Sequence, residues 1–79
     1  MDWNYYNKMG LQALNSANYS EAERLLIAAL ENAERSTEVK IPTSLNNLAS
    51  VYHRQGKYDE AELLYQRALE IDKDRKSVV

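Results

Sequence analysis

The side chains that most often catalyse reactions or bind metals are scarce in this sequence. Histidine occurs once, at His53, and cysteine does not occur, so disulfides and thiolate metal sites are impossible. His53 has no histidine or carboxylate partner at a metal-ligand spacing, and no glycine-rich phosphate-binding loop is present. We interpret His53 as a structural residue near a turn. The sequence therefore predicts no enzyme, no metal and no cofactor.

Two pairs of glutamates are the other candidates for chemistry, because paired carboxylates can act as general acid and base. They are Glu21 with Glu23, and Glu60 with Glu62. Both pairs fall at the predicted starts of helices, where acidic side chains interact favourably with the positive end of the helix dipole. We therefore interpret them as capping and solubilising residues.

The composition predicts one small globular domain spanning residues 1–79. Hydrophobic residues make up 44% and charged residues 28% of the 79 positions. The net charge of −2 argues against nucleic-acid binding, which needs a basic face. No apolar run is long enough to span a membrane, and the N-terminus lacks the pattern of a secretory signal. We expect a cytoplasmic location with no membrane partner.

The chain repeats itself at an offset of 39 residues. Eight of the thirteen positions from 19 to 31 are identical to those 39 residues later: Tyr19, Glu21, Ala22, Glu23, Leu25, Ala29, Leu30 and Glu31. Helical composition alone would rarely produce such agreement. The offset indicates two copies of one supersecondary unit, repeat one over about 3–37 and repeat two over about 42–75.

Each copy contains two stretches with the apolar periodicity of an amphipathic helix. The predicted helices cover about 3–16, 20–37, 43–55 and 59–74. Gly56 suits a helix C-terminus that needs positive φ, and Pro42 suits the first turn of the third helix. Ser20 and Asp59 are the predicted N-caps of the second and fourth helices. The fold class is therefore all-α, with two antiparallel helical hairpins.

The spacing of the apolar and small residues resembles that of the tetratricopeptide repeat. The second copy carries the family outline, and the first carries a degenerate version of it: Leu45, Leu48-Ala49, Tyr52, Gly56, Tyr58, Ala61, Tyr65 and Ala68, against Tyr6, Met9-Gly10, Ala13, Ala17, Tyr19, Ala22, Leu26 and Ala29. The spacing of 39, longer than the usual value of about 34, is similar to that of the kinesin-light-chain subtype. The resemblance implies stacked hairpins in a right-handed superhelix.

The same resemblance assigns residues to the core and to a binding groove. It implies core packing for Tyr19, Tyr52, Tyr58 and Tyr65. It places a concave groove along the first helix of each hairpin, where an Asn can donate to and accept from a peptide backbone. The predicted peptide-binding residues are Asn7, Lys8, Leu11, Asn46, Asn47, Ser50 and Arg54. The predicted function is a scaffold that binds a peptide or a segment of another protein.

The alternative is self-association. A repeat array normally covers its terminal helices, yet the fourth predicted helix carries apolar residues on more than one side: Leu63, Leu64, Leu69 and Ile71. A two-fold interface between fourth helices would form a homodimer without a separate ligand. Further repeats of a longer array would cover the same residues. Met1 and the polar tail favour an intact small protein over a fragment.

Overall fold

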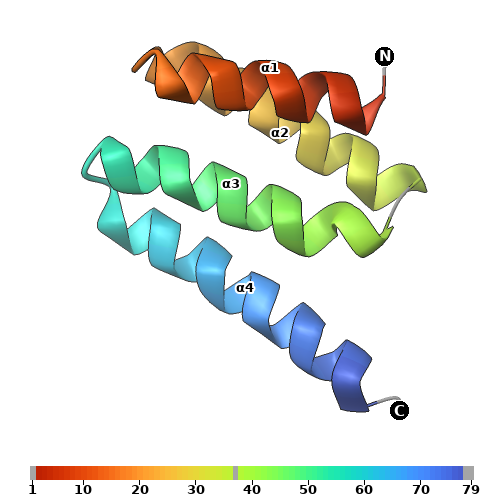
Figure 1. Cartoon of the computed structure of the whole chain (residues 1–79). Coiled ribbons are helices and arrows are strands. Elements are labelled where there is room, and N and C mark those ends of the chain that lie inside the picture. The colour runs from red at the N-terminus through yellow and green to blue at the C-terminus, as the bar shows by residue number, and fades with distance from the viewer. Residues whose placement is uncertain (1, 37, 78–79) are drawn as a thin grey trace.

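The computed structural model describes residues 2–36 and 38–77, with side chains as far as Ile71. Four α-helices follow one another: α1 (Trp3–Asn15), α2 (Tyr19–Ser36), α3 (Ile41–Arg54) and α4 (Tyr58–Ser77). A 3₁₀ turn, η1 (Glu38–Lys40), precedes α3. The described ranges contain no strand, and α1–α2 and α3–α4 form two antiparallel hairpins (Figure 1). The predicted all-α fold class is confirmed.

The two hairpins end their first helices in the same way. In α1, the amide of Asn18 donates to Ala13 O at 2.8 Å; in α3, the amide of Lys57 donates to Tyr52 O at 2.8 Å. Both turns are Schellman motifs, in which the residue before the donating amide adopts a left-handed backbone conformation. That residue is Ala17 (φ 61°) in the first hairpin and Gly56 (φ 81°) in the second. The prediction for Gly56 is confirmed.

The predicted N-caps Ser20 and Asp59 are wrong, because α2 and α4 begin one residue earlier, at Tyr19 and Tyr58. The carbonyl groups of the turn residues Asn18 and Lys57 already accept the first helical hydrogen bonds. The tight turns therefore lead directly into the next helix. The third helix begins two residues before the predicted start, because η1 runs directly into it, and Pro42 lies in its first turn as predicted.

Helix α2 lies at the centre of the core, between α1 and α3. Its Ala22 and Leu26 form one cluster with Leu14 of α1 and with Leu48 and Val51 of α3. Small residues allow the close approach of the helices. Gly10 shows this directly, because a Cβ atom there would lie 2.6 Å from Cγ and Cδ2 of Leu26.

Two of the four predicted core tyrosines are not in the core. Tyr19 and Tyr52 are half-buried and pack against the central cluster, as predicted. Tyr58 is 60% exposed and Tyr65 is 37% exposed, so the prediction for these two residues is wrong. Burial of these positions requires a helix on the outer side of α4, and no helix of the described part of the chain lies there.

Candidate protein-binding surface

The predicted peptide-binding residues belong to α1 and α3, whose ribbons lie side by side in Figure 1. Asn7 of α1 and Asn47 of α3 meet there: Asn47 Nδ2 donates to Asn7 Oδ1 at 2.7 Å, and the bond is partly buried. This bond links the two repeats directly. The structure therefore brings together two of the predicted peptide-binding residues from opposite helices.

The amide pair keeps hydrogen-bonding capacity for a further group. One Nδ2 hydrogen of Asn47 and one lone pair of Asn7 are used in the mutual bond. A carboxamide has two donor hydrogens and two acceptor sites, so this bond uses neither the Asn7 amino group nor the Asn47 carbonyl oxygen. A peptide backbone, which presents both N–H and C=O groups, matches that combination.

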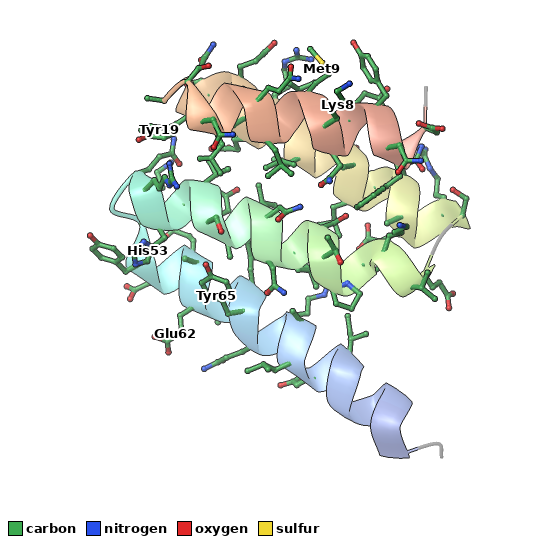
Figure 2. All side chains as sticks on the ribbon, in the orientation of Figure 1. Lys8, Met9, Tyr19, His53, Glu62 and Tyr65 are labelled. Carbon is green, nitrogen blue, oxygen red and sulfur yellow. The ribbon has the colours of Figure 1, made fainter. Side chains whose placement is uncertain are left out.

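The other predicted groove residues divide into two groups. Lys8, Asn46 and Arg54 are exposed, and Figure 2 shows Lys8 on α1. Leu11 is half-buried and packs against the core cluster. Ser50 lies on the side of α3 that faces α4, because its Oγ is 3.5 Å from the Tyr65 hydroxyl. Leu11 thus contributes to the packing of the core, and Ser50 contacts Tyr65 of α4.

The four predicted self-association residues do not form one face of α4. Leu63 and Leu69 are exposed by 66% and 67%, but at about 100° per residue they point roughly 120° apart. Leu64 packs against the core cluster. Ile71 is half-buried and lines, with Glu38, Val39 and Ile41, a cavity of about 260 Å³. Leu69 lies four residues after the exposed Tyr65, on the same flank of α4.

The sequence alone left the position of Trp3 open between packing on the first hairpin and a place on the groove rim, and the structure shows packing on the hairpin. Its side chain is buried against Ala29 and Ala33 of α2, and its indole Nε1 donates to Ser44 Oγ of α3 at 2.6 Å. The ammonium group of Lys40 lies 4.6 Å from the ring centroid, within range of a cation–π interaction. No local sequence pattern indicates a contact between residues 41 positions apart.

Burial and neighbouring charges shift the pKa of individual side chains on this surface. Burial raises the pKa of the Tyr52 phenol, and the charges of Glu23 and Glu60 raise it further. The hydrogen bond from Arg24 lowers the pKa of the exposed Glu21 carboxyl. Since both Glu21 and Arg24 are solvated, this ion pair contributes little to stability. His53 is exposed, and its ring contacts that of Tyr58 edge-to-face, with centroids 4.9 Å apart.

The described residues contain no group of three His, Cys, Asp or Glu side chains close enough to hold a metal ion. None of the helices in this part of the chain is both long and apolar enough to cross a membrane.

Comparison with known proteins agrees with the helical arrangement. The family described as "Tetratricopeptide repeat" matches residues 3–74. No curated protein and no solved structure matches the chain.

Proposed function

The chain belongs to the tetratricopeptide repeat family, and from this premise we propose that it binds an extended segment of another protein along α1 and α3. Repeats of this family generally act as non-enzymatic scaffolds for protein–protein interactions. The kinesin-light-chain subtype, a cytoplasmic location and the absence of catalytic activity in this chain stay predictions from its sequence.

The bond between Asn7 and Asn47 is the observation that carries the proposal. It holds two carboxamides in fixed orientation at the junction of α1 and α3. Fixed side chains lose less conformational entropy when they bind a ligand. Because the amides contact the ligand backbone, they support binding with little dependence on ligand sequence. The exposed Lys8 and Arg54 add positive charge on the same helices, which favours acidic side chains in the ligand.

Self-association is the second candidate, and the exposure of Leu69 favours it. A homodimer through α4 would bury that side chain. One residue predicted for such an interface, Leu64, packs against the core of its own chain instead.

The test uses displayed random dodecapeptides as the probe. Peptides selected on the wild-type chain are titrated against the Asn47→Ala and Gln66→Ala variants by fluorescence anisotropy. Gln66 is an exposed carboxamide on α4 and serves as the matched control. We expect Asn47→Ala to weaken binding by about tenfold, the effect of one lost hydrogen bond in a desolvated contact, and Gln66→Ala to leave it unchanged.

Equal affinity of the selected peptides for wild type and Asn47→Ala would contradict the groove proposal. Circular dichroism melting of each variant separates a lost contact from lost folding. Light scattering coupled to size exclusion, over a wide concentration range, tests the second candidate: a stable dimer in the absence of peptide would support self-association.

A further inference from the structure

Three exposed apolar side chains form a row along one flank of α4. Tyr58, Tyr65 and Leu69 follow one another at steps of seven and four residues, so they lie on the same side of the helix. We call them the α4 stripe, which extends over about 16 Å at 1.5 Å per residue. Figure 2 shows Tyr65 and Glu62 on α4. Glu62, four residues after Tyr58 and three before Tyr65, lies beside the middle of the stripe.

The internal repeat identifies what covers the same positions in the first hairpin. At the 39-residue offset, the stripe corresponds to Tyr19, Leu26 and Leu30 of α2. Leu26 is fully buried in a cluster with Leu48 and Val51 of α3, and Tyr19 and Leu30 pack against that cluster. The α4 stripe is therefore the second copy of a surface that, in the first copy, holds an amphipathic helix.

The second copy differs from the first in polarity. Ser50 and His53 of α3 stand where the first copy has the core-packed Leu11 and Leu14 of α1. Tyr65 stands where the first copy has Leu26, and its hydroxyl lies 3.5 Å from Ser50 Oγ. Hydroxyl and imidazole groups stay hydrated when the surface is open, whereas leucines at the same places would lose the stabilisation that burial gives them. These replacements fit a surface that is covered reversibly.

We propose that the α4 stripe binds an amphipathic α-helix of another protein. The bound helix would pack as α3 packs on α2, with aliphatic side chains three residues apart, at the places of Leu48 and Val51. Tyr52 of α3 lies close enough to Glu23 for the carboxylate to raise its pKa. Glu62 is the counterpart of Glu23, so a hydroxyl or basic group of the bound helix would face Glu62. This site is distinct from the groove of the proposed function.

A second copy of the chain fits the stripe poorly. If the second copy packed its α1 on the stripe, Gln12 and Ala13 would stand at the places of Val51 and Tyr52. An amide and a methyl group would then replace two large contacts. A two-fold pairing of α4 stripes would bring the two Glu62 carboxylates near one another, which is unfavourable. A partner of different sequence avoids both conflicts.

The probe for the test is a synthetic, fluorescently labelled peptide with the sequence of residues 38–57, added to the full chain. Leu69 and Leu63 form a matched pair, because they are leucines of the same helix with nearly equal exposure on different flanks. We expect the peptide to bind saturably, Leu69→Lys to weaken binding by roughly tenfold or more, and Leu63→Lys to leave it within about twofold. A peptide carrying Leu48→Gln and Val51→Gln should not bind.

Equal binding by the two lysine variants, or no saturable binding to the wild-type chain, would overturn the proposal. A concentration-dependent dimer of the wild-type chain alone that Leu69→Lys abolishes would also overturn it, since the occupant would then be a second copy. Loss of binding to the groove-selected peptides by Asn47→Ala, with the helical peptide still bound, would support two separate sites.

Discussion

The indole Nε1 of Trp3 donates a hydrogen bond of 2.6 Å to Ser44 Oγ, joining the first turn of α1 to the first half of α3. Ser44 is fully buried, and Trp3 is nearly so. The ring of Trp3 packs on Ala29 and Ala33 of α2, the helix that lies between the two partners. Together with Asn7–Asn47, this bond fixes the position of repeat one on repeat two at a second point.

Replacement of Trp3 by Phe should destabilise the fold by about 1–3 kcal/mol, because the buried Ser44 hydroxyl loses its donor. The double variant Trp3→Phe/Ser44→Ala should lose less than the sum of the two single changes, since no polar group is then left unpaired. Urea denaturation followed by circular dichroism measures all four free energies of unfolding. Additive losses would show that the hydrogen bond has no energetic role.

The two Schellman turns provide a second prediction, because only one of them has glycine at its left-handed residue. Ala17→Gly should stabilise the chain by about 0.5–1 kcal/mol, since glycine adopts positive φ without the strain that a Cβ atom causes. Gly56→Ala should destabilise it by a similar amount, although no atom lies within 4 Å of the added methyl group. The urea midpoints of both variants measure these opposite changes.

The matched control for the turn is Ala28→Gly in the interior of α2, where glycine should cost about 1 kcal/mol. If Ala17→Gly is as destabilising as Ala28→Gly, strain at Ala17 does not limit stability.

The sequence predicts features that depend on local chemistry. Gly56 and Pro42 were placed correctly because left-handed φ and the first helical turn select those residue types directly. Ala17 carries no such signal, although the 39-residue offset predicts a turn at its position. The N-caps at Ser20 and Asp59 were wrong because a favourable cap residue does not show whether the preceding turn leaves room for a cap.

Features that depend on neighbouring helices were not predictable. Tyr58 and Tyr65 match core positions of the family outline, but their burial depends on a helix beyond α4, which the repeat pattern of α4 alone does not specify. Trp3 and Ser44 have no periodic relation to one another. The sequence predicts both Asn7 and Asn47 in the groove, yet their mutual bond depends on the spacing and rotation of α1 and α3. Such pairings arise from packing.

Gly10 supports a third prediction about the contact between α1 and α2. An added methyl group would lie 2.6 Å from Leu26 Cγ, and the fully buried Leu26 has little space to move. Overpacking in Gly10→Ala should therefore destabilise the fold by about 1–3 kcal/mol. The better helix propensity of alanine should offset about 0.5–1 kcal/mol of that loss. Chemical denaturation measures the loss, and a Gly10→Ala/Leu26→Ala double variant that loses less than the two single variants together would confirm steric coupling between the sites.

Tyr52 supports a prediction about alkaline pH. Burial, with the charges of Glu23 and Glu60, raises its pKa in the folded chain, so the folded state keeps the phenolic proton at a pH where the unfolded state has lost it. The stabilising effect of the neutral phenol is complete below its ordinary pKa of about 10 and is lost as the pH rises through the folded pKa. The free energy of unfolding of wild type should therefore fall more steeply above pH 10 than that of Tyr52→Phe. Urea titrations from pH 8 to 11 measure both slopes, and identical slopes would show that Tyr52 ionises as easily in the fold as in the unfolded chain.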